Sequence, residues 1–230
     1  MTNSSRFLAL FDLDHTLLPL DSDYHWADFL ARTGRVGDPE EAIRRNEELM
    51  ARYTQGNLSA EESFAFMLGL IALRPMAELN AWHEEFMTTI IQPAISPAAL
   101  ELIKKHQEQG HLCAIVTATN EFVTAPIAQA LGFEHLIATI PEEKNGQFTG
   151  RVQGVPSYQE GKITRVDDWL AQLGRNREQF ERIWFYSDSI NDLPLMRMVS
   201  DPVATNPCAQ LRTHAEQAQW PIIELFTQNA

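Results

Sequence analysis

Cysteine, long apolar runs and positive charge are scarce in this sequence, and each shortage excludes a class of protein. The two cysteines, Cys113 and Cys208, are too few for a disulfide framework or a cysteine metal site, and we expect both to be buried small residues. No apolar run approaches the ~20 residues that cross a bilayer. The opening residues, MTNSSRFLALFDLDH, place acids where a targeting segment would be apolar. We therefore expect a cytoplasmic protein without membrane contact.

Basic residues are also few relative to acidic ones. The chain has 18 lysines and arginines against 31 aspartates and glutamates, a formal net charge of −13. This balance argues against a sequence-independent grip on nucleic acid or anionic lipid, because both require clustered basic side chains. An anionic substrate would need a metal ion or a few converging basic residues. The 230 residues, 44% of them apolar, suffice for one large domain or a main domain with a smaller one.

Short apolar runs alternate with helix-like patterns over most of the chain. The stretch SPAALELIKKHQEQG, for example, begins with Ser96 and Pro97 and ends at Gly110, which are typical helix start and stop residues. The runs expected to form strands buried on both faces are 6–12, 111–117, 134–140, 181–187 and 201–205. The alternation predicts an α/β fold with a doubly wound, mostly parallel, Rossmann-like sheet.

One section interrupts this alternation. Between residues 22 and 91 the sequence shows several amphipathic helical patterns and no convincing strand, and one pattern starts with the capping-box residues Ser59 and Glu62. We expect this section to form a helical cap over the sheet. The predicted division is an α/β core of residues 1–17 and 92–230 and a cap of residues 18–91.

A second, smaller departure lies at residues 141–156, PEEKNGQFTGRVQGVP. Here Asn145 and Gly146 stand between short alternating segments. An Asn-Gly pair in this position favours a tight turn, so we expect a small hairpin.

Acidic, hydroxyl and basic side chains follow the predicted strands where each strand ends. Asp12 and Asp14 follow the first strand, and their spacing of two points both carboxylates the same way. Without a counter-charge, one member of such a pair would stay protonated. The later positions of this kind are Thr117, Lys162, Asp188, Asn191 and Asp192. Because ligands of open parallel sheets sit at the strand ends, these residues together predict a Mg²⁺-assisted phosphoryl-transfer site.

Four of these segments resemble the ordered motifs of a known family. FDLDHT, IVTAT, the Gly-Lys pair at 161–162 and YSDSINDLPLM are similar to the motifs of the haloacid dehalogenase superfamily. The resemblance is to its Mg²⁺-dependent phosphatases with a helical cap of the C1 type, the phosphoserine phosphatase-like branch (subfamily IB). Each motif alone is a weak signal, but four in this order, with a cap after the first, cover nearly the whole chain.

The resemblance implies a role for each matching residue. Asp12 would be the nucleophile that forms an aspartyl-phosphate, and Asp14 the general acid and base. Mg²⁺ would be held by Asp12, the backbone carbonyl of Asp14 and Asp188, with support from Asp192. The residues left to bind the phosphoryl group and line the pocket would be Thr117, Lys162 and Asn191.

The sequence also departs from the family pattern. Ser187 and Ser189 stand where the fourth motif usually has glycine, and His15 stands where phosphoserine enzymes carry a small hydroxyl residue. These changes leave the metal ligands in place. They bear on the substrate instead, and His15 is a candidate for substrate contact.

We expect the substrate to be a phosphate ester of a small molecule, and the resemblance implies a leaving group with a positive charge. Asp21 is placed like the acid that binds the substrate ammonium in phosphoserine phosphatases, and Asp23 adds a second acid. O-phosphoserine would also need a cap arginine, for which Arg52 is the best candidate beside Arg44 and Arg45. Histidinol phosphate needs acids and aromatic packing without that arginine, and it is slightly favoured. Phospholipid head-group phosphates are a third alternative.

An alternative interpretation, from a different functional class, is that the protein is a non-catalytic phosphate-binding module on the same scaffold. Retention of Asp14, Lys162 and Asp188 together speaks against it, because a binder needs no general acid beside the nucleophile. The sequence leaves the oligomeric state open between a monomer and a homodimer.

Overall fold

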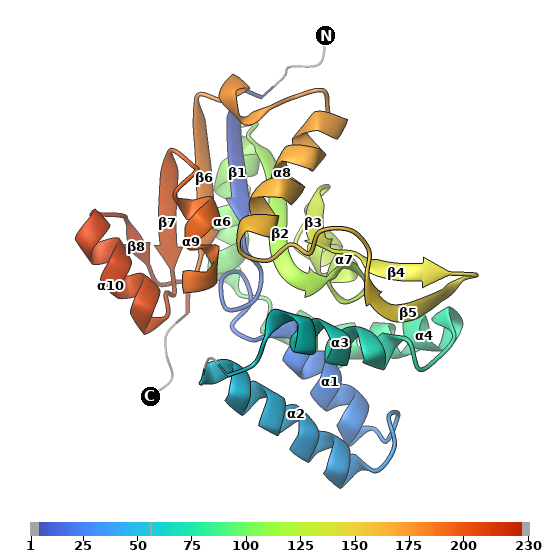
Figure 1. Cartoon of the computed structure of the whole chain (residues 1–230). Coiled ribbons are helices and arrows are strands. Elements are labelled where there is room, and N and C mark those ends of the chain that lie inside the picture. The colour runs from blue at the N-terminus through green and yellow to red at the C-terminus, as the bar shows by residue number, and fades with distance from the viewer. Residues whose placement is uncertain (1–4, 56, 227–230) are drawn as a thin grey trace.

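A six-stranded parallel sheet forms the centre of the molecule (Figure 1). The structure is a computed structural model and describes residues 5–55 and 57–226. The strand order is β3, β2, β1, β6, β7, β8. The bounds are β1 (Phe7–Phe11), β2 (Leu112–Asn120), β3 (Leu136–Thr139), β6 (Arg182–Ser187), β7 (Asp201–Thr205) and β8 (Ile222–Ile223). Because the chain winds outward on both sides of β1, the switch point of the sheet lies between β1 and β6.

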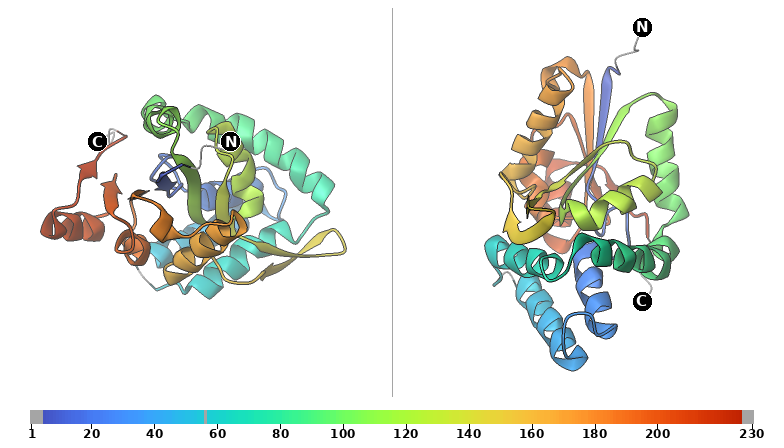
Figure 2. Two further views of the ribbon diagram at one scale, coloured as in Figure 1. Left: turned by 90° about the horizontal axis from the view of Figure 1, so that it is seen from above. Right: turned by 90° about the vertical axis from the view of Figure 1, so that its right-hand side faces the viewer.

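Both faces of the sheet are buried, because side chains alternate along each strand. In β1, Leu8 and Leu10 belong to one apolar cluster, and Ala9 and Phe11 belong to the other. The first face is covered by α8 (Glu160–Gln172), α9 (Leu193–Met196) and α10 (Ala209–Ala218), the second by α6 (Pro97–Glu108) and α7 (Glu121–Ala130). Figure 2 shows helices on both sides of the sheet. The predicted doubly wound α/β fold is confirmed.

An all-helical segment follows β1 and lies beyond the carboxyl ends of the strands (Figure 1). It comprises α1 (Ser22–Arg32), α2 (Pro39–Thr54), α3 (Ala60–Ile71) and α4 (Met76–Phe86). Ser59 and Glu62 form the expected capping box at the start of α3. The last helix continues through a π-helical stretch, Met87–Ile91, into α5 (Gln92–Ala94). The helical cap is therefore present, whereas its exact limits at residues 18 and 91 stay a prediction.

The expected hairpin is formed by β4 (Pro141–Lys144) and β5 (Gln147–Val152), which pair antiparallel. Asn145 and Gly146 at the turn have φ values of 54° and 76°. Two successive positive φ values explain the Asn-Gly pair, because these residues adopt that conformation most readily. Since β5 packs against α3, the hairpin lies beside the cap (Figure 1).

Three details differ from the expectations. The strand β2 continues three residues past Thr117 to Asn120, because the Asn120 side chain accepts a hydrogen bond from Val123 N and so starts α7 only there. The short edge strand β8 was not expected, since two residues carry no readable alternation. Cys208 is exposed at the start of α10, whereas Cys113 is buried, and both are free thiols.

Aromatic side chains join the cap to the core. Trp26 of α1 packs edge-on against Phe86 of α4 and Phe122 of α7, with ring centroids 5.3 Å and 5.8 Å apart. His83 of α4 donates a hydrogen bond from Nε2 to the carbonyl of Val123 at 2.9 Å. Aromatic pairs of this geometry stabilise beyond the area they bury. They fix α1 and α4 over α7 and thereby place the cap above the strand ends.

Apolar content is high in two cap helices. No single helix within residues 5–55 and 57–226 is long and apolar enough to cross a membrane. The pair formed by α3 and the segment Met76–Ala94 reaches that length and apolarity jointly, but the two parts are bent by 103° at their junction. Leu68 and Ile71 of α3 and Leu79 of α4 lie buried in the apolar cluster that the cap shares with the core.

Candidate active site

Asp12 and Lys162 meet at the switch point of the sheet. Asp12 directly follows β1, and its backbone N donates to the carbonyl of Tyr186 in β6 at 2.8 Å, which fixes it between the two strands. Lys162 Nζ lies 2.8 Å from Asp12 Oδ1 and 2.7 Å from the Asp192 carboxylate. Asp12 is 7% and Lys162 2% exposed. The predicted lysine therefore reaches the predicted nucleophile, although 150 residues separate them.

The glycine before Lys162 is required by close packing. A Cβ atom on Gly161 would lie 2.1 Å from the carbonyl oxygen of Pro156. Because no other residue fits this approach, the start of α8 can come close enough for Lys162 to reach the strand ends. Gln159, the residue directly before α8, has φ 49° and ψ −123°, a conformation that costs energy for a residue with a side chain. The turn into α8 is thus held in a specific shape.

Asp188 is linked to Asp12 through Thr16, a residue whose role the sequence did not reveal. The Thr16 hydroxyl accepts a hydrogen bond from Asp188 N at 2.9 Å and lies 3.1 Å from Asp188 Oδ1 and 3.5 Å from Asp12 Oδ2. Its place in the FDLDHT motif, two residues after Asp14, is the signal that could have found it. Thr16 brings the two predicted metal-binding carboxylates to one point.

Asp192 is turned toward Lys162 and Ser187. The Ser187 hydroxyl donates to Asp192 Oδ2 at 2.7 Å. Burial raises the pKa of Asp192 to about 6, although the Lys162 ammonium opposes that rise. Burial also disfavours the charged form of Lys162, but Asp12 and Asp192 outweigh it and raise the pKa of Lys162 above its usual range. Ser187, which stands where the family usually has glycine, thus helps to position Asp192, and Asp192 in turn binds Lys162.

Asp14 has two hydrogen-bond donors. Ser22 N donates to its Oδ1 and the Thr119 hydroxyl to its Oδ2, both at 2.7 Å. Burial, and next the negative charge of Asp21, raise the pKa of Asp14 to about 6. Such a pKa suits a group that gives and takes a proton near neutrality. Thr119 was missed, because its strand was expected to end at Thr117.

Asp21 and Asp23 lie beside Asp14 where cap and core meet, and we call these three residues the seam acids. Asp21 caps α1 by accepting from Tyr24 N at 2.8 Å, and Asp23 accepts from Asn120 Nδ2 of the core at 3.0 Å. Burial raises the pKa of Asp21 and of Asp23, and Asp21 raises that of Asp23 further. No lysine or arginine forms an ion pair with a seam acid within the described part of the chain. In that part of the chain the partners of the seam acids are therefore neutral hydrogen-bond donors.

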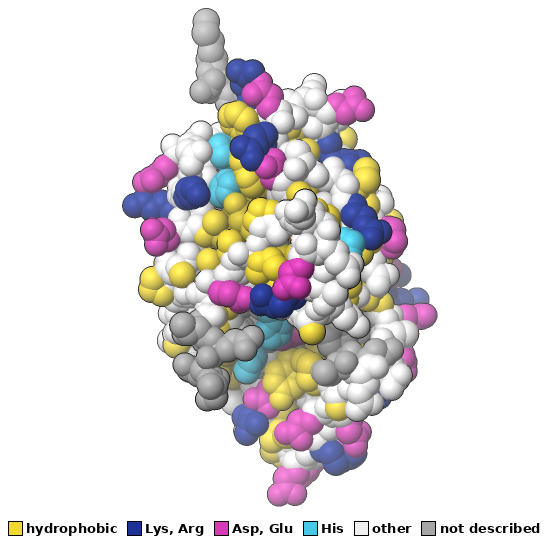
Figure 3. Space-filling model, turned by 90° about the vertical axis from the view of Figure 1, so that its left-hand side faces the viewer, with side chains coloured by type: hydrophobic (Ala, Val, Ile, Leu, Met, Phe, Trp, Pro, Cys, Tyr) yellow, Lys and Arg dark blue, Asp and Glu magenta, His cyan; other side chains and the backbone are white. Residues whose placement is uncertain are grey.

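The remaining predicted residues divide into near and remote ones. Thr117 is buried and accepts from Thr119 N at 3.2 Å, next to the seam acids. Asn191 lies 3.4 Å from Gln159 at the turn before Lys162. His15 is exposed and lies close enough to Asp21 to oppose part of the rise in the pKa of that carboxyl, which burial causes. Figure 3 shows histidine side chains at the surface where core and cap meet.

Arg52 is not brought to this cluster. Its guanidinium binds Glu62 at 2.9 Å and the carbonyl of Asn57 at 3.2 Å, within the cap. It lines a pocket of about 420 Å³ between α2 and α3 together with Arg45 and Glu62. Arg52 therefore bonds to other residues of the cap and not to the acids at the strand ends.

The donor set at the strand ends fits a magnesium ion in part. Asp12, Asp188 and Asp192 face a single ammonium, so negative charge is in excess, and burial and its acidic neighbours raise the pKa of Asp188 well above its usual value. A divalent cation would relieve this excess, and carboxylate oxygens are the ligands Mg²⁺ prefers. However, no three His, Cys, Asp or Glu side chains among the described residues are arranged as a metal cage. Asp12, through the carboxylate oxygen that Lys162 does not contact, and Asp188 would be the side chains that bind a metal, and a backbone carbonyl would complete the set.

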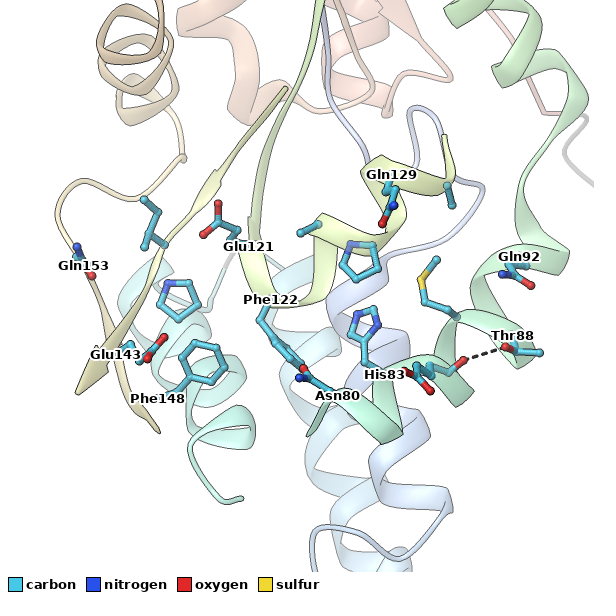
Figure 4. A pocket seen from close by; sticks show the side chains of 17 residues that line it. Asn80, His83, Thr88, Gln92, Glu121, Phe122, Gln129, Glu143, Phe148 and Gln153 are labelled. Atoms are coloured by element: carbon cyan, nitrogen blue, oxygen red, sulfur yellow. Dashed lines mark hydrogen bonds between the residues drawn. The ribbon is translucent and has the colours of Figure 1, made fainter. Parts of the chain in front are cut away.

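A wide groove lies away from this cluster of residues. It has a volume of about 940 Å³ and runs between α4, α7 and the hairpin (Figure 4). Its lining includes His83, Glu121, Phe122 and Phe148, and none of the predicted site residues. The chemistry at the strand ends therefore does not coincide with this groove.

Three known proteins are similar to this chain over most of its length. The first is a histidinol-phosphatase of Neisseria meningitidis serogroup C, 41% identical over 217 residues, which cover 94% of this chain and 97% of that protein. The second is a phosphoserine phosphatase of Mycobacterium tuberculosis, 32% identical over 220 residues, 93% of this chain and 69% of that protein. The third is a crystal structure of a protein with unknown function from Bordetella pertussis Tohama I. It has 56% identity and a TM-score of 0.94, and the match covers 97% of this chain and 100% of that one.

A family model agrees with these similarities. The model of the haloacid dehalogenase-like hydrolases matches residues 9–197, which include the strand-end motifs and the cap. The order of Asp12, Lys162 and Asp188 along the chain and their meeting at the switch point are what the motifs predict. The chain therefore belongs to the family of haloacid dehalogenase-like hydrolases.

Proposed function

We propose that this phosphoric monoester hydrolase uses Mg²⁺ and an aspartyl-phosphate intermediate to release phosphate from a small phosphorylated amino alcohol, such as histidinol phosphate. The observation that carries the proposal is the contact of Lys162 Nζ with both Asp12 and Asp192 at the switch point. Such a buried ammonium beside a nucleophile can neutralise a phosphoryl group without rearrangement.

In the first half-reaction, a carboxylate oxygen of Asp12 attacks phosphorus, and the bond from phosphorus to the ester oxygen breaks. Asp14 gives its proton to the departing oxygen, for which a pKa of about 6 is suitable. In the second half-reaction, Asp14 takes a proton from water, the water oxygen attacks phosphorus, and Asp12 is released. Asp14 thus ends in its starting state.

Lys162 and Thr117 bind the oxygens of the phosphoryl group, and Asp192 with Ser187 keeps the lysine in place. Mg²⁺, held by Asp12, Asp188 and the backbone carbonyl of Asp14, would supply positive charge for the developing negative charge. Thr16 orients both carboxylates. The direct test is release of phosphate from a generic aryl phosphate with Mg²⁺ and after its removal by a chelator. Activity that is unchanged by the chelator would contradict the role of the metal.

For the leaving group, the seam acids favour a cation. Asp21 and Asp23, two partly exposed carboxylates with no lysine or arginine partner among the described residues, would bind an ammonium, and His15 lies close enough to Asp21 to influence its pKa. The relative named histidinol-phosphatase supports the same choice. A side-by-side assay of histidinol phosphate and O-phosphoserine tests it, with a higher kcat/KM expected for histidinol phosphate.

O-phosphoserine is the second candidate, favoured by the relative named phosphoserine phosphatase. Its carboxylate would need a cationic partner, and Arg52 is already paired with Glu62. We therefore place it second. A preference for a sugar phosphate would contradict both candidates, because sugar hydroxyls carry no positive charge.

A cytoplasmic location and a monomeric or homodimeric state stay predictions. The alternative of a non-catalytic phosphate-binding protein predicts that phosphate binds but no ester is cleaved. The aryl phosphate assay separates these two classes.

A further inference from the structure

Asn206, the first residue after β7, joins two segments that are far apart in the sequence. Its Nδ2 donates to the carbonyls of His15 at 2.9 Å and Thr16 at 3.2 Å. Its Oδ1 accepts from the backbone N of Leu225 at 2.6 Å and of Phe226 at 3.3 Å. One amide therefore connects the loop after β1 with the chain that follows β8.

The backbone at this junction is as specific as the side chain. Asn206 has φ 47° and His15 has φ 56°, and both values lie in the left-handed region that residues with a side chain rarely adopt. Asn206 N also donates to the carbonyl of Ile223 at 2.8 Å. Unusual backbone conformations persist where the surroundings hold them, and they gather at functional sites.

The same short segment supports the second acidic loop. Two residues further on, Cys208 N donates to the carbonyl of Asp188 at 2.8 Å. The carbonyls of Thr16 and Asp188 are thus both held by residues 206–208, while their side chains bond each other at 3.1 Å. Residues 206–208 therefore bond to both loops.

We propose that Asn206 is a positioning residue, and that with Leu225 and Phe226 it aligns the Thr16 and Asp188 loops for phosphoryl transfer. The inference rests on the proposed function of that site. The hydrogen bonds of the Asn206 side chain run to backbone groups, so it would act through the backbone of Thr16 and not on the phosphoryl group itself. Catalytic groups must be held within about half an ångström of their productive geometry, and supporting hydrogen bonds provide that precision.

The alternative is that Asn206 only fastens β8 to the edge of the sheet. The two halves of its amide separate these roles, because Oδ1 serves the segment after β8 and Nδ2 serves the catalytic loop. Asn206→Asp keeps the acceptor for Leu225 and Phe226 and loses the donor to His15 and Thr16. Asn206→Gly removes both halves without adding charge, and it retains access to the left-handed backbone conformation.

The experiment measures kcat and KM for a generic aryl phosphate with Mg²⁺, together with thermal unfolding. We expect a decrease in kcat of about tenfold or more in both Asn206→Asp and Asn206→Gly, with KM changed less than threefold. Asn145 offers a matched control, since it has φ 54° in the hairpin turn. Asn145→Asp and Asn145→Gly should keep the wild-type kcat.

Each outcome decides the inference. If Asn206→Asp folds and its kcat stays within twofold of wild type, or if both Asn206 variants are unfolded at the assay temperature, Asn206 is a residue of the fold alone. A change confined to KM would also contradict a positioning role. An inactive wild-type protein would instead refute the proposed function, so the two failures are distinguishable.

Discussion

Two groups of acids lie at the strand ends, one buried and one partly exposed, and they differ in what balances their charge. Asp12 and Asp192 share the ammonium of Lys162, at 2.8 Å and 2.7 Å. The seam acids, Asp14, Asp21 and Asp23, have hydrogen-bond donors but no lysine or arginine among the described residues. In the proposed function, the first group is organised in advance for an anionic phosphoryl group. The second group would receive its cation from the leaving group of the substrate.

The comparison teaches that residue type alone does not assign these aspartates. Burial raises the pKa of members of both groups, so burial does not distinguish them either. Their partners distinguish the two groups. Acids beside a fixed ammonium favour the binding of a phosphate, and acids without one favour the binding of a cation. The following predictions test the two halves of this assignment.

The largest effect is expected at the lysine-paired half. Asp12→Asn removes the nucleophile and should lower kcat for an aryl phosphate by at least about a thousandfold. Circular dichroism should show a folded protein, because the amide retains the shape of the carboxylate. Asp167→Asn, at a surface pair with Arg177, is the control with unchanged kcat. More than a tenth of wild-type activity in the Asp12 variant would remove the nucleophile assignment.

A smaller decrease in kcat is expected when Lys162 is kept but moved from its position. Gly161→Ala puts a Cβ atom 2.1 Å from Pro156 O, so the start of α8 must shift. We expect kcat to fall by about ten- to a hundredfold, because small misplacements of a charged group are costly. Gly69→Ala is a matched control in α3, where an added Cβ meets nothing within 4 Å. Equal kcat values in the two variants would show that Lys162 tolerates displacement.

The seam acids should affect the choice of substrate more than the chemistry. Asp23→Asn keeps an acceptor for Asn120 and removes one charge from the seam acids. We expect kcat/KM for histidinol phosphate to fall by about tenfold, which corresponds to about 1.4 kcal/mol, while an aryl phosphate without an ammonium changes less than twofold. Asp28→Asn, on the same helix and paired with Arg32, serves as control. An equal loss of kcat/KM with both substrates would mean that Asp23 does not bind the leaving group.

The smallest effect is a gain in stability. The pKa of Asp23 is raised in the folded protein above its ordinary value of 3.8, first by burial and then by Asp21. The folded state therefore binds more protons than the unfolded state above about pH 4, and the carboxylate destabilises the fold increasingly as the pH rises through that range. Asp23→Asn should stabilise the metal-free protein at pH 7 by on the order of 1 kcal/mol.

Urea unfolding at pH 7 and at pH 4 checks this sign. The gain of the Asp23 variant should shrink toward zero at the lower pH, where the unfolded carboxyl is itself becoming protonated. A variant that is less stable than wild type at pH 7 would mean that the seam acids are balanced within the protein.

The sequence predicted the parts of this site that a motif or a strand end carries. Asp12, Lys162, Asp188 and Asp192 follow short apolar runs or open a helix, and their meeting follows from the topology of a parallel sheet. The support of these residues was not predictable in the same way. Thr119 and Asn206 act through contacts over more than 100 residues, and no local pattern marks such a partner.

The fold shows the same division. The alternation of strands and helices and the Asn-Gly turn are local signals, and they predicted the sheet, the cap and the hairpin. The extension of β2 to Asn120 depends on a side chain that caps the next helix, and this extension supplies the groups that hold Asp14 and Asp23. Arg52 was a candidate on helix position alone, and its pairing with Glu62 depends on how two cap helices pack.

The most direct test of the account is the kcat/KM of the wild-type protein for histidinol phosphate and for the same ester without its ammonium group. If the seam acids bind the cation of the leaving group, the charged ester should be preferred by about a hundredfold, and Asp23→Asn should reduce that preference about tenfold. Equal kcat/KM values for the two esters would contradict the assignment of the seam acids to the substrate.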